Sequence, residues 1–380
     1  LRPPATLREG IFLFLLVLLL FSLIYSRYLL SVSMLGLMGT LFLEEGPGLR
    51  PGLGSWRRAL QGIGRQPALG ASMLFFAIVL IGGLYSSDTG YWLERLRIKL
   101  PLLGLPLAFA AAPRLSRRQL AALLYFWLGL LVITCLGVGL NYVLHFSEIQ
   151  EGIKRGQAVP VPTNHIRFSL MMALGVVAAG WLYLQRFSFR YRWEARALGA
   201  CGLFLFLFMH LLAVRSGLAV LYATLGFVAL RAAWTSRRYW LGAGALALLL
   251  TLPLLMYVAL PSFKAKVGYV MWDLKMHLSG KGESYSDSER ITSLQIGWET
   301  FRENPWLGVG PGDLKAEVHR RYAEKFGPDK RPYMPHNQWL SIAAGSGLPA
   351  LLLTLAAFFF PLFYHRNYRH QLLLSFHLIL

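Results

Sequence analysis

The chain has 380 residues, 56% of them hydrophobic, and a formal net charge of +20 at pH 7. Its apolar residues are gathered into blocks longer than a soluble core helix needs, and a helix crosses the hydrocarbon core of a bilayer with about 20 residues. These features exclude an ordinary soluble enzyme and predict an all-α protein, a polytopic bundle of membrane-spanning helices.

Taken in chain order, the apolar blocks predict ten membrane spans and the start of an eleventh near residue 371. The first block is not a cleavable signal, because a second apolar block follows at once without a small-residue cleavage pattern. The eleventh span stops at Leu380, so we expect both natural ends to lie outside this sequence. The ten complete predicted spans are 11–26, 29–43, 72–86, 97–112, 119–144, 166–185, 197–214, 216–233, 239–260 and 337–364.

The distribution of basic residues predicts the orientation of these spans. If the N-terminus is cytoplasmic, the six inner segments hold 18 Lys and Arg residues and only four acidic ones. Cytoplasmic loops are enriched in Lys and Arg, so this orientation is favoured. It places the long hydrophilic segment, with 12 basic and 10 acidic residues, on the outer side. The predicted parts are a transmembrane bundle at 1–260, a periplasmic loop domain with short helices at 261–335, and C-terminal transmembrane helices at 336–380.

Two short helices are predicted in the outer segment. Ser286 and Glu289 form a capping-box pattern at the start of the first, which ends at Asn304-Pro305. Its expected apolar face is Ile291, Leu294, Trp298 and Phe301.

A glycine-rich turn, "WLGVGPGD", separates the first outer helix from the second. Asp313 is a suitable cap for the second helix. Pro335 is expected in the first turn of the next membrane span. The apolar face expected of the second outer helix is Leu314, Val318, Tyr322 and Phe326.

Several functions are disfavoured by what the sequence lacks. All 18 acidic residues fall in predicted loops or at span ends, which argues against an ion-driven transporter. We predict no metal site, because the acid-x-acid pattern at Asp287 and Glu289 is already explained by the capping box. We predict no cofactor and no nucleic-acid partner, since the glycine loop lacks the preceding strand of a nucleotide-binding fold. Cys135 and Cys201 lie inside apolar blocks and are expected to be free thiols.

His336 is the first candidate for chemistry, because it precedes the apolar run of a membrane span. The positive end of a helix dipole disfavours the protonated imidazole, which suits a general base. An interfacial histidine that caps or anchors the helix is the alternative. Its neighbour Asn337 is a candidate for substrate binding.

Arginines at the outer ends of spans are the other candidates. Arg215 stands alone between two apolar blocks, where a charge is costly without a partner or ligand. Arg167, with His165 two residues before it, is similarly placed. Each arginine either binds an anionic substrate or anchors its helix in lipid phosphates. Arg290, near the start of the first outer helix, opposes the helix dipole, so it either binds a phosphate or is an ordinary exposed residue.

The order of four motifs resembles that of the O-antigen ligase and polymerase superfamily of bacterial inner-membrane glycosyltransferases. The motifs are Arg215-Ser216-Gly217, Ser288-Glu289-Arg290, "NPWLGVGPGD" and "HNQWLSIAAGSGLPALLL". The resemblance covers the second half of the chain and the overall layout of many spans with one large outer loop. It implies about twelve spans in the full protein.

The resemblance also implies an activity. Members transfer a glycan from undecaprenyl diphosphate, without a metal, and ligases use a sugar hydroxyl of the lipid A core as acceptor. His336 matches the essential histidine of the family, while Arg215 and Arg290 match outer-face arginines that hold the donor diphosphate. Backside displacement would invert the anomeric configuration, with His336 as general base.

We therefore predict an O-antigen ligase in the inner membrane of a Gram-negative bacterium, with its active site facing the periplasm. Its predicted partners are the lipid-linked donor, the lipid A core acceptor and membrane lipids, with no obligatory protein partner. An O-antigen polymerase and a protein O-oligosaccharyltransferase are alternatives within the superfamily. A non-enzymatic lipid or polysaccharide transporter is the alternative of another class.

Overall fold

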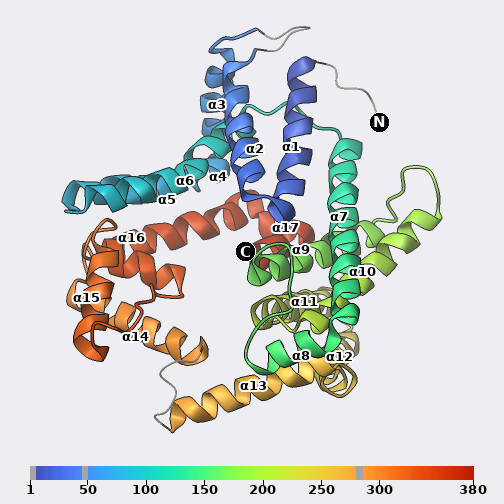
Figure 1. Ribbon diagram of the computed structural model, residues 1–380. Coiled ribbons are helices and arrows are strands. Elements are labelled where there is room, and N and C mark those ends of the chain that lie inside the picture. Colours follow the sequence, from blue (N-terminus) through green and yellow to red (C-terminus); the bar gives the residue numbers. More distant parts are fainter. Residues whose placement is uncertain (1–5, 45–49, 280–285) are drawn as a thin grey trace.

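The computed structural model describes residues 6–44, 50–279 and 286–380, and all the regular elements in these ranges are helices (Figure 1). One isolated β-bridge joins Leu43 and Pro51. The α-helices are α1 Leu7–Tyr25, α2 Arg27–Gly39, α3 Gly54–Arg65, α4 Pro67–Gly70, α5 Met73–Gly82, α6 Thr89–Ala110, α7 Arg117–Leu144, α8 Phe146–Lys154, α9 His165–Leu184, α10 Trp193–Leu212, α11 Arg215–Ser236, α12 Tyr239–Ala259, α13 Pro261–Leu278, α14 Ser286–Glu303, α15 Leu314–Phe326, α16 Gln338–Phe363 and α17 Gln371–Ile379.

The predicted polytopic membrane protein is confirmed at the level of its helices. Within the described ranges, eight segments are long and apolar enough to cross a membrane. They correspond to eight of the eleven predicted spans. The other three predicted spans also form helices but fall short: α2 with its 3₁₀ extension is too short, α6 carries four charged residues in its first half, and α17 has 9 residues.

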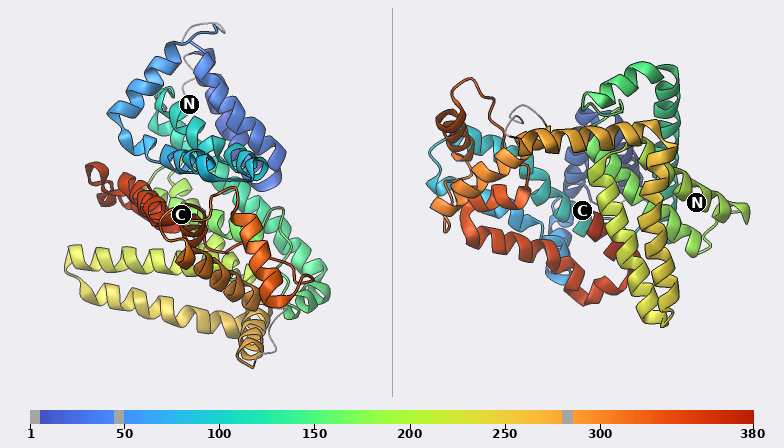
Figure 2. Two further views of the ribbon diagram at one scale, coloured as in Figure 1. Left: turned by 90° about the vertical axis from the view of Figure 1, so that its left-hand side faces the viewer. Right: turned by 90° about the horizontal axis from the view of Figure 1, so that it is seen from below.

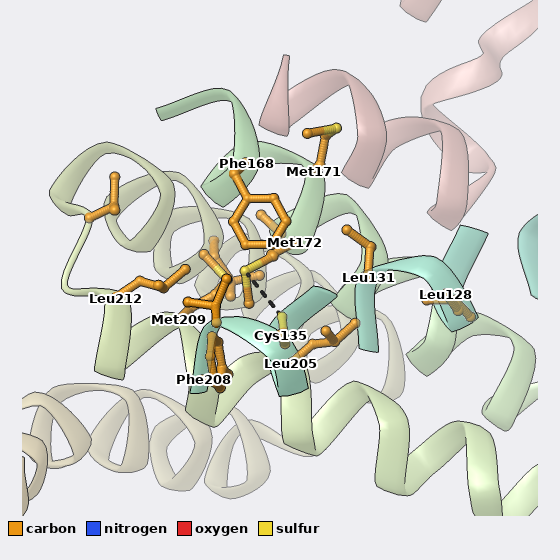
Figure 3. Close-up of a cluster of buried hydrophobic side chains, with 14 of the residues drawn as sticks. Leu128, Leu131, Cys135, Phe168, Met171, Met172, Leu205, Phe208, Met209 and Leu212 are labelled. Atoms are coloured by element: carbon orange, nitrogen blue, oxygen red, sulfur yellow. Dashed lines mark hydrogen bonds between the residues drawn. The ribbon is translucent and has the colours of Figure 1, made fainter. Parts of the chain in front are cut away.

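The largest apolar core is built by α7, α9, α10 and α11 (Figure 3). Both predicted free thiols are confirmed, and Cys135 lies in this core with its Sγ 4.0 Å from Met172 Sδ. In contrast, α11 and α12 extend as a hairpin beyond the rest of the molecule (Figure 2). Only 6% of the apolar stretch of α12 is buried inside the protein, as expected for a helix that contacts lipid.

Contacts between distant loops agree with the predicted alternation of the chain between two faces. On the predicted inner side, Arg8 Nη2 donates to Ala111 O over 2.7 Å, and Arg231 Nη1 donates to Tyr368 O over 2.6 Å. On the predicted outer side, Lys266 Nζ donates to Gly156 O over 2.9 Å. Segments predicted for one side therefore meet one another.

In its described residues, the predicted outer segment contains three helices rather than two. Besides α14 and α15, it includes α13, which begins with Pro261, a residue that favours the first helical position. The expected face of α15 is confirmed, since Leu314, Val318 and Tyr322 are buried.

The expected apolar face of α14 is confirmed only in part, by Phe301, which packs against a buried cluster with residues of α15 and α16. Trp298 is 54% exposed, whereas Ser293, Ile296, Gly297 and Thr300 are buried. The small side chains on this face allow α14 to approach the chain before α16, where a Cβ on Gly297 would meet Pro335 Cγ at 2.7 Å. The capping box at the start of α14 lies outside the described residues, because the side chain of Ser286 is not described.

Two local expectations around α15 and α16 are also corrected. Asp313 is the N-cap residue of α15, but its carboxylate makes no capping bond there. It accepts instead from the amides of Ser87 and Asp88, over 2.7 and 2.8 Å, and so joins the outer loop to the start of α6. Pro335 lies three residues before the first residue of α16 and is buried against α14.

The two glycine-rich motifs contact each other. At Gly347, α16 is broken by a left-handed backbone conformation with φ of 80° and ψ of 178°. Because Pro349 has no N–H, the carbonyl of Gly345 lacks its helical donor and accepts from Gly310 N over 3.0 Å. The carbonyl of Ala344 likewise accepts from Val309 N over 3.0 Å. These bonds fix the first half of α16 to the turn between α14 and α15, and the predicted tight turn is confirmed by the positive φ of Gly308 and Gly310.

Candidate active site

His336 lies in the short connection between the outer helices and α16. Its backbone N–H donates to Ser293 Oγ on α14 over 3.4 Å. Ser293 Oγ in turn donates to the carbonyl of Arg290, one turn earlier, over 2.8 Å. His336 is therefore held beside the turn of α14 that follows Arg290, while its side chain is exposed.

Asn337 has a structural task in this connection. It is the N-cap residue of α16, and its Oδ1 accepts from Leu340 N over 3.1 Å. The bond satisfies one of the amides left without a partner at the start of a helix. Asn337 thereby fixes the point where α16 begins, and so the position of the preceding His336.

Arg215, Arg290 and His165 meet at one cavity, although they come from three helices. The cavity has a volume of about 190 Å³. Arg215 is the first residue of α11, His165 is the first residue of α9, and Arg290 is the fifth residue of α14 rather than its opening residue. The structure thus brings together three of the six residues that the sequence singled out.

Lys266 on α13 also lines this cavity, and sequence reasoning missed it. Only the tertiary structure indicates its importance, because in sequence it is one of 12 basic residues of the outer segment. No carboxylate is among the described residues that line the cavity. Three basic side chains therefore line one space.

The start of α11 adds to the positive character of this cavity. The backbone turns sharply before the helix, with Ala213 in the left-handed region at a φ of 50°. The N-cap residue is Val214, whose side chain cannot accept a hydrogen bond from the first amides of α11. Helix N-termini with exposed amides attract anions such as phosphates.

A second, apolar cavity of about 270 Å³ adjoins the charged one. Ala213, Arg215 and Lys266 line both cavities. The remaining lining of the second cavity is apolar and comes from α11 and α13, namely Leu218, Phe263, Val267, Val270 and Met271. An anionic group in the first cavity could therefore carry an apolar chain into the second.

The other predicted residues do not line the charged cavity. Arg167 is exposed one turn into α9, and Asn337 caps α16. His336 is not in the lining either, but it is close enough to Arg290 for the guanidinium charge to act on its imidazole. A larger cavity of about 680 Å³ between α9, α10, α11 and α12 contains none of the six residues.

The surroundings of His336 favour its neutral form. Although the side chain is exposed, desolvation by the surrounding protein and then the positive charge of Arg290 lower the pKa of His336 below its ordinary value. The Glu289 carboxylate opposes this shift with a smaller effect. A neutral imidazole has a free nitrogen that can accept a proton near pH 7.

Residues 200–355 match a family model described as O-Antigen ligase. The matched region runs from α10 to the middle of α16, so it includes Arg215, Lys266, Arg290 and His336. No curated protein matches the chain.

Proposed function

We propose that this chain is a ligase that transfers a glycan from undecaprenyl diphosphate to a sugar hydroxyl of the lipid A core, and the match of residues 200–355 to a family model described as O-Antigen ligase supports this. One observation carries the proposal: the cavity lined by Arg215, Arg290 and Lys266 adjoins an apolar cavity. A donor with a diphosphate next to a polyprenyl chain fits this pair of environments.

In the proposed reaction, the acceptor hydroxyl attacks the anomeric carbon of the donor while a ring nitrogen of His336 takes the hydroxyl proton. The bond between the anomeric carbon and the diphosphate oxygen breaks, and its electron pair remains on undecaprenyl diphosphate. Attack from the side opposite the leaving group inverts the anomeric configuration. General base catalysis of this kind accelerates a reaction by about 100- to 10,000-fold.

The basic residues of the charged cavity would stabilise the leaving group. Negative charge grows on the departing diphosphate, and guanidinium groups bind phosphate oxygens through charge-assisted hydrogen bonds. Arg215 and Arg290 carry out this role in the proposal, and Lys266 adds a third positive charge. His165 would contact the diphosphate from the start of α9.

The setting of His336 fits the meeting of two lipid-linked substrates. His336 precedes the first turn of α16, a predicted membrane span. The head groups of the two substrates would therefore meet at the membrane surface while their lipid tails stay in the bilayer. In the proposed orientation this surface faces the periplasm of a Gram-negative inner membrane. Arg167, exposed at the start of α9, would contact a lipid or donor phosphate there.

The proposal is tested with purified protein in detergent, a lipid-linked glycan donor and rough lipopolysaccharide, without nucleotide and with excess chelator. Wild type should join the glycan to the acceptor, and His336→Ala should lower the rate at least about 100-fold. His319→Ala, which alters an exposed histidine on α15, is the matched control and should retain activity.

Two other results would contradict the proposed ligase. If wild type lengthens the lipid-linked glycan and leaves the lipopolysaccharide unchanged, the protein is a polymerase. If it does neither and instead moves the donor across vesicles, the protein is a transporter.

A further inference from the structure

A second cavity with basic side chains lies between α16 and the pair formed by α5 and α6, and the first residue of α15 also lines it. It has a volume of about 330 Å³ and is enclosed by α5, α6, α16 and the turn before α15. We call it the α6 cavity. In Figures 1 and 2, α5 and α6 lie along one side of α16, and α14 lies along the other.

Two positive charges of the α6 cavity come from one face of α6. Arg95 and Lys99 are separated by four residues, which places them one above the other on a helix. Arg95 pairs with Glu94 over 3.1 Å, and its guanidinium lies 4.6 Å from the centre of the Tyr91 ring. Its Nε is buried and has no hydrogen-bond partner in the part of the chain that the structure describes.

Lys99 is half-buried, and no acidic side chain pairs with it within the described ranges. The wall around it is otherwise mostly apolar, with Phe75, Ile78 and Val79 from α5 and Ile342 from α16. A positive charge in such surroundings is costly unless a counter-ion accompanies it. The cavity therefore has the character of a site for an amphiphile with an anionic group.

The α6 cavity is adjacent to the candidate base. Met334, Pro335 and Gln338 line it, and these residues flank His336 and Asn337 in sequence. None of the residues that line the charged cavity of Arg215 and Arg290 also lines the α6 cavity. His336 is thus a sequence neighbour of residues that line the α6 cavity, and it is close enough to Arg290, which lines the other cavity, for the guanidinium charge to act on it.

From this arrangement we propose that the α6 cavity binds the acceptor, a saccharide lipid that carries phosphate, through Lys99 and Arg95. The inference rests on the proposed function, in which the cavity of Arg215 and Arg290 holds the donor. The apolar wall contacts the acyl region of the acceptor, the two cations bind its phosphate, and the saccharide extends past Gln338 towards His336. Each substrate then reaches the base from its own side.

The test is direct binding of rough lipopolysaccharide to the full chain in phosphatidylcholine nanodiscs, with no donor present. The probes are the phosphorylated acceptor and the same acceptor after chemical dephosphorylation. Lys99→Gln should weaken binding of the phosphorylated form on the order of tenfold, as expected for loss of one charge-assisted contact. It should leave binding of the dephosphorylated form unchanged.

Arg97→Gln is the matched control, because Arg97 is exposed on the same helix and does not line the cavity. It should bind both acceptors as wild type does, and Lys99→Arg should restore binding. Thermal unfolding of each variant separates a binding defect from a folding defect.

Three results would overturn the assignment. Equal affinities of Lys99→Gln and wild type would show that the cation does not contact the acceptor. An equal loss for both acceptor forms would show that no phosphate is recognised. If Lys99→Gln weakens the binding of phosphatidylglycerol as much as it weakens the binding of the acceptor, an ordinary membrane lipid is the occupant. Because no glycan is transferred in this measurement, failure of the proposed ligase activity would be seen only in the separate transfer assay.

Discussion

The contact at Gly347 predicts that Gly347→Ala disrupts both stability and the site. A Cβ at this position would lie 1.9 Å from the carbonyl oxygen of Trp306, and backbone cannot move aside as a flexible side chain can. The φ of 80° adds strain, since a residue other than glycine in such a conformation costs about 1–3 kcal/mol. Overpacking typically adds about 1–3 kcal/mol.

The expected destabilisation is therefore about 2–6 kcal/mol, a large fraction of the stability of an ordinary protein. The midpoint of thermal unfolding in detergent should fall by at least about 2 °C. The same substitution should lower glycan transfer, because the first half of α16 is fixed to the outer turn at this contact and carries His336 at its start.

Gly244→Ala on α12 is the control, since a Cβ there would meet no atom within 4 Å. It should leave the midpoint unchanged or raise it slightly, because alanine favours a helix by up to about 1 kcal/mol over glycine. If Gly347→Ala unfolds at the wild-type temperature and remains active, the packing of the two glycine motifs against each other is refuted.

Three further predictions concern charges of the outer segment. Arg290→Gln should raise the pKa of His336, because the charge of Arg290 is one cause of its low value. The acidic limb of the pH–rate profile should therefore move to higher pH. Arg302→Gln, at the exposed end of α14, is the control and should leave the limb in place, and an unmoved limb in Arg290→Gln would refute the coupling. Asp313→Asn should lower the midpoint of thermal unfolding, because a charged hydrogen bond contributes about 1.5–3 kcal/mol. Asp329→Asn, which alters an exposed residue, is the control and should leave the midpoint unchanged. Equal midpoints for Asp313→Asn and wild type would argue against the contact with Ser87 and Asp88. The hydrogen bond from Arg321 holds the pKa of Glu303 below its usual value. The pairing therefore stabilises α14 against α15 above the ordinary glutamate pKa of about 4.3, and this stabilisation is lost as the pH falls below that value. Arg321→Gln should make thermal unfolding less sensitive to acid, and an unchanged pH dependence would contradict this role of the pair.

The sequence was most informative where one-dimensional patterns decide the structure. Long apolar blocks identified the membrane helices, because a bilayer demands apolar segments of a set length. The basic loops predicted which segments share a face, and the contacts of Arg8 and Lys266 agree. The amphipathic face of α15 could be read from its helical spacing, since that helix packs apolar side chains against its neighbours.

The same reasoning failed where small residues carry the packing. On α14, spacing favoured the large apolar side chains, but the helix buries Ser293, Gly297 and Thr300. Close approach of two backbones requires small side chains, and a hydrophobic pattern does not register them. The glycines before Asp313 could be recognised as a turn, yet nothing local indicated that they pack against the glycines after His336.

By itself, the sequence determined that this protein is a helical membrane protein, and its motifs resemble those of O-antigen ligases and single out His336, Arg215 and Arg290 as candidate residues. Those conclusions depend on residue types at set spacings along the chain. Only the tertiary structure decided that Lys266 joins the two arginines at one cavity, and that the neighbours of His336 in sequence line a second cavity with Arg95 and Lys99. Electrostatic attraction acts through space, so the grouping of cations from α11, α13 and α14 at one cavity, and of two cations from α6 at another, exists only once the helices have packed.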